Sequence, residues 1–199
     1  MKTLRFPFAI SFVFIFLFSN LFSQTPESVE VSDEVNELEL SFADPIWDGV
    51  NIPDGQRCNA CGEHGSSPRI YVDNIPENTD AILLYFSKGL PLNLNQKFGT
   101  GISTIGTSNG IIGYHVSNND GKILIPSVAG HTSELPEGFF QVKQPLQKID
   151  GERGAYLPPC DCDDRAWYFV HVKAVSINSS EPNDFTELRS GNLTMGRTR

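Results

Sequence analysis

Residues 154–175 read GAYLPPCDCDDRAWYFVHVKAV, and the second half of this stretch decides the fold class. Within it, Val170, Val172 and Ala174 alternate with a histidine and a lysine. Successive side chains of a β-strand point to opposite faces, so a period of two places the apolar residues on one face. The pattern predicts a strand with one buried face, which begins shortly after two prolines and two cysteines.

Elsewhere in the chain, short apolar runs alternate with turn signals. The continuous run 81–86 predicts a central strand that is covered on both faces, and a further strand is expected near 38–42. Segments 74–80 and 118–121 have the Asn, Pro, Asp and Gly content of turns. No helical period appears over a useful window. We therefore predict an all-β fold, a sandwich or a barrel, in one domain over residues 41–199.

The N-terminus has the features of an export signal. Lys2 and Arg5 precede the apolar stretch 8–18, and small polar residues follow it. An uncleaved membrane anchor is the alternative, although the apolar core is shorter than the roughly 20 residues of a spanning helix. We predict a signal peptide over residues 1–23 and a flexible acidic leader over residues 24–40, and hence a secreted or periplasmic protein.

Charge limits the classes of partner. Removal of the signal leaves 13 basic and 24 acidic residues, which is a net charge of about −11. This balance argues against nucleic acid and anionic membrane surfaces as partners, but it is compatible with one small anion pocket. No segment after the signal is long and apolar enough to span a membrane. The sequence contains no nucleophile elbow, phosphate-binding loop or zinc-protease motif, so we expect no enzyme activity, catalytic residue or cofactor.

Four cysteines form two short pairs about a hundred residues apart. Cys58 and Cys61 make a C-x-x-C motif, and Cys160 and Cys162 make a C-x-C motif. The spacing permits a four-thiolate zinc site or a redox motif, whereas export favours disulfides. We expect two disulfides that connect the two loops, in either of the two cross-linked arrangements.

The ordered set of motifs resembles the phosphatidylethanolamine-binding protein family, in particular its bacterial secreted, Raf-kinase-inhibitor-like branch. The resemblance covers roughly residues 47–196. Its motifs are WDGVNIPDGQRCNACGEHGSSPRIYVDNIPENTDAILLYF, KILIPSVAGHTSELPEGF, the stretch 154–175 and LRSGNLTMG. The resemblance implies a β-sandwich of a large and a small sheet, with a cavity at one end that accepts a small anionic ligand such as a phospholipid head group.

The resemblance also implies which residues surround this cavity. Two prolines would line it, and a tyrosine hydroxyl at the start of the following strand would donate a hydrogen bond to a bound oxygen. An arginine and a lysine are the best cations in the sequence for a phosphoryl group. The ligand-binding candidates are Tyr156, Pro158, Pro159, Tyr168, Arg165 and Lys88.

Three departures from the family pattern predict a degenerate pocket. The acidic Asp-Pro-Asp-x-Pro element falls on SKGLP at 87–91, which supplies no carboxylate. Ala166 stands at one histidine position, and Asn118 or Asn119 stands at the other. The second hypothesis is therefore an extracellular interaction module with a filled pocket, which presents the glycine-rich stretch 98–113 to a protein or a glycan as a loop or irregular hairpin.

Other polar and aromatic residues are weaker candidates, since each has an ordinary structural role available. They are His64, His115 and His131 as ligands, Asp161, Asp163 and Asp164 as a calcium cluster, and Trp47 and Trp167 as an aromatic wall.

Overall fold

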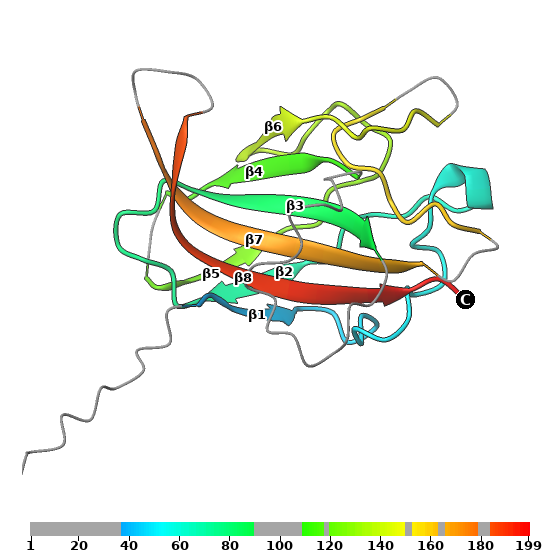
Figure 1. Ribbon diagram of the computed structural model, residues 1–199, viewed down its shortest axis with the longest axis horizontal. Coiled ribbons are helices and arrows are strands. Elements are labelled where there is room, and N and C mark those ends of the chain that lie inside the picture. The colour runs from blue at the N-terminus through cyan, green and yellow to red at the C-terminus, as the bar shows by residue number, and fades with distance from the viewer. Residues whose placement is uncertain (1–36, 90–108, 118–119, 150–152, 163–165, 179–183) are drawn as a thin grey trace, which may run out of the picture. The chain divides into compact units, whose positions relative to one another are not determined.

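The computed structural model describes residues 37–89, 109–117, 120–149, 153–162, 166–178 and 184–199. Within these ranges the chain forms eight β-strands and one short 3-10 turn, η1 (Asn59–Cys61). The strands pair in two antiparallel sheets (Figure 1). The predicted all-β fold is confirmed, and the architecture is a sandwich of a small and a large sheet. The predicted signal peptide lies outside the described residues.

The small sheet has the strand order β1-β2-β5. Its strands are β1 (Glu39–Phe42), β2 (Ile70–Asp73) and β5 (Lys122–Ile125). The large sheet has the order β6-β4-β3-β7-β8. Its strands are β6 (Phe139–Lys143), β4 (Ile111–His115), β3 (Ala81–Gly89), β7 (Trp167–Ile177) and β8 (Phe185–Arg197).

Strand β3 is the central strand of the large sheet. It pairs with β4 on one side and β7 on the other, so its main chain is hydrogen-bonded along both edges. Ile82 and Leu84 pack in the core between the sheets, together with Val72 of the small sheet. Leu83 points to the opposite face and is also fully buried. Burial on both faces explains the unbroken apolar run, as the sequence predicted.

Strand β7 shows the predicted alternation. Val170, Val172 and Ala174 are completely buried in the core between the sheets, whereas His171 and Lys173 are only partly buried on the outer face. The apolar face stabilises the sandwich because burial removes apolar surface from contact with water, which contributes about 25 cal/mol per Å². The inner residues of β7 therefore fix which face of this strand meets the small sheet.

Two boundaries differ from the sequence-based expectation. Strand β1 begins at Glu39 and Leu38 is buried, so the sandwich starts a few residues before position 41. Of the loop or irregular hairpin predicted over 98–113, the loop alternative is wrong for 111–113, because β4 begins at Ile111 and pairs antiparallel with β3; residues 98–108 lie outside the described part of the chain. Gly113 lies in β4, where a Cβ atom would come within 2.1 Å of the Phe140 ring. Gly113 thus provides space for the Phe140 ring within a strand, and it does not mark a flexible turn.

One end of the sandwich gathers the loops that carry the candidate residues. The last residue of β3 pairs with the first residue of β7, at Gly89 and Trp167. Turn η1 and the segment that leads into β7 lie at this same end (Figure 1). In the described ranges, no helix has the length and apolar character that crossing a membrane requires.

Candidate functional site

Two disulfides connect the loops at this end of the sandwich. Cys58 is bonded to Cys160, and Cys61 is bonded to Cys162. The expected cross-linked disulfides are thus present, and the zinc and redox alternatives do not apply, since no cysteine is free. The Cys58 amide also donates a 2.9 Å hydrogen bond to the Pro159 carbonyl. The disulfides and this bond hold the η1 loop against the segment before β7.

The segment 154–159 forms a buried, hydrogen-bonded wall. The Leu157 amide donates to the Asn109 carbonyl at 3.0 Å, and the His131 amide donates to the Tyr156 carbonyl at 3.0 Å. Pro158 packs against Gly130 so closely that a Cβ atom there would lie 2.1 Å from the proline Cγ. Because main-chain bonds and close packing hold this segment, it is a rigid boundary for anything bound beside it.

The sequence-predicted ligand residues have unequal positions. Tyr156, Pro158, Pro159 and Tyr168 are buried, and Arg165 lies outside the described residues. These four residues lie in or beside the wall, and none of them lines the open pocket described below. The structure therefore places most of this predicted set inside the sandwich end.

Lys88 and Tyr168 meet at a single carboxylate. The Lys88 ammonium group forms an ion pair with one Asp161 oxygen, and the Tyr168 hydroxyl donates to the other oxygen. The Tyr168 oxygen in turn accepts a 3.0 Å hydrogen bond from the Cys160 amide. Burial, and then the hydrogen bond to Asp161, raise the pKa of the Tyr168 phenol above its ordinary value, so it stays protonated.

Tyr156 is enclosed by the core. Its side chain is 1 % exposed, and its ring lies 4.4 Å from the Phe86 ring, centroid to centroid. Its hydroxyl has no hydrogen-bond partner among the described residues. Burial raises the pKa of this phenol. Tyr156 therefore contributes apolar packing to the wall, whereas Tyr168 contributes a hydrogen-bonded hydroxyl.

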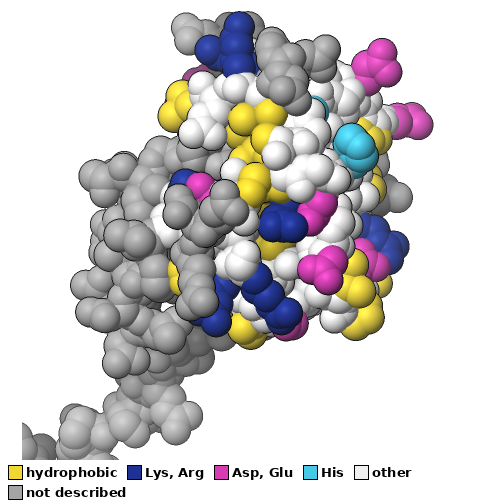
Figure 2. Space-filling model, turned by 90° about the vertical axis from the view of Figure 1, so that its right-hand side faces the viewer, with side chains coloured by type: hydrophobic (Ala, Val, Ile, Leu, Met, Phe, Trp, Pro, Cys, Tyr) yellow, Lys and Arg dark blue, Asp and Glu magenta, His cyan; other side chains and the backbone are white. Residues whose placement is uncertain are grey.

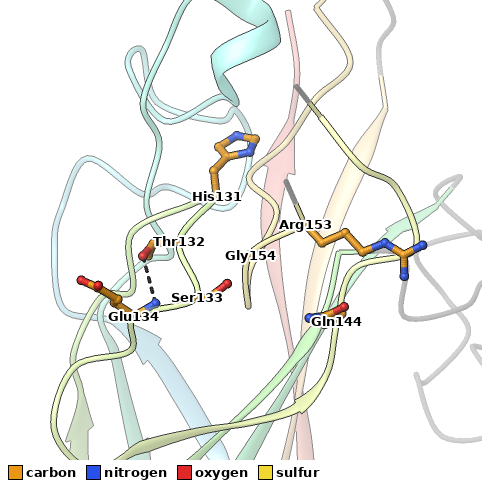
Figure 3. A pocket seen from close by; sticks show the side chains of 7 residues that line it. All are labelled: His131, Thr132, Ser133, Glu134, Gln144, Arg153 and Gly154. Atoms are coloured by element: carbon orange, nitrogen blue, oxygen red, sulfur yellow. Dashed lines mark hydrogen bonds between the residues drawn. The ribbon is translucent and has the colours of Figure 1, made fainter. Parts of the chain in front are cut away.

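A polar pocket of about 510 Å³ opens beside this wall, and we call it the end pocket (Figure 3). Its lining comes from three segments and consists of His131, Thr132, Ser133, Glu134, Gln144, Arg153 and Gly154. The Ala155 amide donates to the Thr132 carbonyl at 2.8 Å, and the Thr132 hydroxyl oxygen accepts from the Glu134 amide at 3.0 Å. The first bond fixes the 131–134 side of the pocket to the buried wall, and the second is a local bond within that side.

Two residues with a left-handed backbone conformation lie against each other in the lining of the end pocket. His131 and Gly154 both have φ of 62°. A Cβ atom on Gly154 would lie 2.7 Å from the carbonyl carbon of His131, so only glycine fits there. Positive φ is uncommon for residues other than glycine, and such conformations concentrate at functional sites where the surroundings enforce them.

The chemistry of the end pocket is that of a site for polar groups. Arg153 is exposed and forms no ion pair with a carboxylate of the described residues. The Arg153 guanidinium, which extends away from Ser133 in Figure 3, can bind an oxyanion through two parallel hydrogen bonds, and the Ser133 hydroxyl and the Gln144 amide are further donors of the lining. Glu134 adds one negative charge to the rim.

His131 is held away from this chemistry. Its ring points toward η1 and away from Ser133 in Figure 3. Its Nε2 atom accepts a 3.3 Å hydrogen bond from the Asn59 amide. The hydroxyl of Ser133 and the imidazole therefore do not form the nucleophile and base pair of a hydrolase.

Among the weaker candidates, His115 and the two tryptophans have ordinary packing roles. The His115 ring lies 4.6 Å from the Phe140 ring on the outer sheet face. Trp47 is buried against Phe42, and Trp167 packs with Arg197, so the two tryptophans form no common wall. Across the described ranges, no cluster of His, Cys, Asp and Glu could hold a metal ion; Asp163 and Asp164 lie outside these ranges.

The sequence missed most of the end pocket. Thr132 and Ser133 lie within the motif KILIPSVAGHTSELPEGF but were not among the predicted ligand residues, Gln144 lies in no quoted motif, and Arg153 precedes the stretch 154–175 by one residue. The polar run before Leu-Pro-Glu-Gly is the nearest signal, since four polar residues follow Gly130 there. Figure 2 looks onto this end and shows basic and acidic side chains next to one another instead of one patch of a single charge.

Comparison with known proteins gives matches among solved structures. No family model matches this chain, and no curated protein matches it. Among solved structures, a proposed phosphatidylethanolamine-binding protein homolog from Chlamydia trachomatis is similar, with a TM-score of 0.46 and 17% identity. The match covers 82% of this chain and 98% of the other chain.

Proposed function

We propose that this chain is an exported, non-enzymatic protein that binds a small ligand through a phosphoryl or similar anionic group in the end pocket. The observation that carries this proposal is the guanidinium of Arg153, which is unpaired within the described ranges, at a rigid polar pocket beside the buried wall. The ligand class is the one that the family resemblance implied. The location is different, because the end pocket replaces the cavity expected at the two prolines.

The donors near Tyr168 are already occupied, which explains why we place the ligand in the end pocket and not in the cavity predicted at the two prolines. A ligand oxygen at the predicted place would need the Tyr168 hydroxyl and the Lys88 ammonium, and both already bind Asp161. In the end pocket, the Arg153 guanidinium has no carboxylate partner among the described residues. An anion therefore gains new hydrogen bonds there without displacing an existing ion pair.

The expected affinity is modest. A charge-assisted hydrogen bond contributes about 1.5–3 kcal/mol, and the exposed rim screens the Arg153 charge. The Glu134 carboxylate offsets part of the attraction. These opposing effects suggest a dissociation constant of about 1 mM for inorganic phosphate, which corresponds to roughly 4 kcal/mol. A larger ligand would gain further contacts, since about 510 Å³ lies within the range of small-molecule pockets.

Export and the absence of catalysis rest on separate observations. Two disulfides in a chain with this N-terminal sequence favour an oxidising compartment, outside the cell or in the periplasm. The orientation of His131 away from Ser133 supports a binding role instead of a hydrolytic one. The tethered wall and the disulfides serve a binding site by keeping its donors in place.

The location of binding can be mapped directly. Phosphorylethanolamine and inorganic phosphate are titrated to 20 mM, at constant ionic strength, into isotopically labelled protein. We expect saturable amide shifts at Thr132, Ser133 and Gly154, with small changes at Tyr168. Shifts confined to Lys88 and Tyr168 would show that the ligand binds in the predicted cavity and not in the end pocket. No saturable shift anywhere would contradict the anion-binding proposal while leaving the fold unaffected.

A further inference from the structure

The carboxylate of Asp161 occupies a place that is built like an anion site. Lys88 and Tyr168 are directly opposed on neighbouring strands, since they form a cross-strand pair of β3 and β7. Opposed residues project to the same face of a sheet. The ammonium group and the phenol therefore converge at the end of the sandwich, and one carboxylate accepts from both of them.

Asp161 belongs to neither strand. It lies between Cys160 and Cys162, and each of these cysteines is bonded to the η1 loop. Its side chain is 14% exposed, and its two oxygens accept from different donors, Lys88 and Tyr168. The two disulfides thus hold the nearly buried Asp161 carboxylate, which belongs to a loop, beside Lys88 and Tyr168 of the large sheet.

We infer that Lys88 and Tyr168 form a second anion site whose ligand is the chain's own Asp161, and that a small carboxylate or phosphate binds there once Asp161 is removed. This site is separate from the end pocket, because neither donor lines that pocket. The ligand class follows from the donors: a cation and a neutral hydroxyl bind the two oxygens of one compact oxyanion.

The tether explains why the native chain keeps this site closed. A group that is held next to its partner competes as if present at an effective concentration of millimolar or higher. The disulfides hold Asp161 in this way, so external anions at a few millimolar do not displace it. A buried phenol and a partly buried ammonium group without this carboxylate would lack their acceptor, which gives a free anion a reason to enter.

The test is rescue by a small anion. Asp161→Ala removes the carboxylate and leaves space for formate, whereas Asp161→Asn fills the same space without charge. We expect Asp161→Ala to lower the unfolding midpoint by roughly 4–8 °C. Sodium formate at 50 mM should restore at least half of this loss, and sodium chloride at equal ionic strength should not. Asp161→Asn should show no selective response to formate.

Further variants assign the rescue to this site. Lys88→Gln combined with Asp161→Ala should abolish the formate effect, whereas Arg153→Gln combined with Asp161→Ala should retain it. If Asp161→Ala folds only in formate, refolding yield in formate against chloride becomes the measurement, and a selective gain supports the inference. Equal midpoints or yields in formate and chloride overturn it. Because Arg153 is not involved, either result leaves the function proposed for the end pocket independently testable.

Discussion

Gly154 and His131 face each other main chain to main chain, and both have φ of 62°. A Cβ atom on Gly154 would lie 2.7 Å from the carbonyl carbon of His131. The base of the end pocket thus depends on one glycine and on one histidine in an uncommon conformation. The hydrogen bonds from the 131–134 loop to the wall hold this pair in place.

Gly154→Ala is expected to destabilise the protein by about 2–4 kcal/mol. The methyl group meets main-chain atoms that cannot rotate away, and the positive φ adds strain for any residue with a Cβ atom. Denaturant unfolding followed by circular dichroism measures the difference. Anion binding in the end pocket should weaken as well, because the wall must shift.

Gly55→Ala is the matched control for this substitution. Gly55 has φ of 83°, yet a Cβ atom there meets nothing within 4 Å. The control isolates the conformational strain, which costs about 1–2 kcal/mol. Equal effects of the two substitutions would show that close approach at Gly154 contributes nothing.

The two disulfides are expected to act cooperatively. Each closes a loop of about a hundred residues by itself, since the sequence separations are 102 and 101. Once one is formed, the other closes a ring of only about seven residues. On the chain-entropy account, removal of one disulfide costs about 2–3 kcal/mol, and removal of both costs about 7 kcal/mol.

Cysteine-to-serine pairs test this expectation. Cys58→Ser with Cys160→Ser removes one disulfide, Cys61→Ser with Cys162→Ser removes the other, and the fourfold variant removes both. Urea unfolding gives the free energies of unfolding. Strictly additive losses would contradict the shared-loop account.

Removal of the hydroxyl is expected to have opposite effects at the two buried tyrosines. Tyr156→Phe deletes a buried hydroxyl that has no partner among the described residues, so stability should stay equal or rise by up to about 1 kcal/mol. Tyr168→Phe deletes the donor to Asp161, so stability should fall by about 1–3 kcal/mol. Thermal unfolding of both variants provides the comparison. A loss at Tyr156 equal to that at Tyr168 would reveal a partner for the Tyr156 hydroxyl.

Acid should weaken the loop that carries Cys58. Arg57 donates to Glu63 from its main-chain amide at 2.7 Å and from its guanidinium Nε at 2.8 Å. The hydrogen bond from the Arg57 side chain is the main cause that lowers the pKa of Glu63 below its ordinary value of 4.5. A lowered acid pKa stabilises the fold above about pH 4.5, and the effect is lost as pH falls through the folded-state pKa.

Glu63→Gln measures this contribution. We expect the variant to be less stable at pH 7 by about 1–2 kcal/mol, since the pair is partly exposed. The difference should shrink as the pH falls below 4.5. A difference that stays constant between pH 7 and pH 3 would mean that the charge of Glu63 is not responsible.

The strands were predictable because local patterns determine them. The inner residues of β7 alternate with polar ones, and the 81–86 run is apolar throughout, so both strands follow from the side-chain period. Gly113 was misleading because glycine in a strand and glycine in a loop look alike in sequence. Only the position of Phe140 above Gly113 separates the two cases.

The site was less predictable because it depends on contacts between distant segments. The disulfide class followed from export, but the choice between the two cross-linked pairings required the structure. Asp161 was considered as a calcium ligand, whereas it accepts from Lys88 and Tyr168. The meeting of 131–134 with 153–154 left no periodic signal, since hydrogen bonds between loops have no sequence spacing.

Titration of Arg153→Gln with phosphorylethanolamine shows whether the guanidinium at the end pocket binds the phosphoryl group. The substitution removes a guanidinium that has no carboxylate partner among the described residues, and it should leave the exposed surface otherwise unchanged. Lys148→Gln is the matched control, because it removes an exposed positive charge outside the pocket lining. Calorimetry at fixed ionic strength gives the affinities. We expect at least tenfold weaker binding for Arg153→Gln and unchanged binding for Lys148→Gln; equal affinity of the wild type and Arg153→Gln would contradict anion binding by the end pocket.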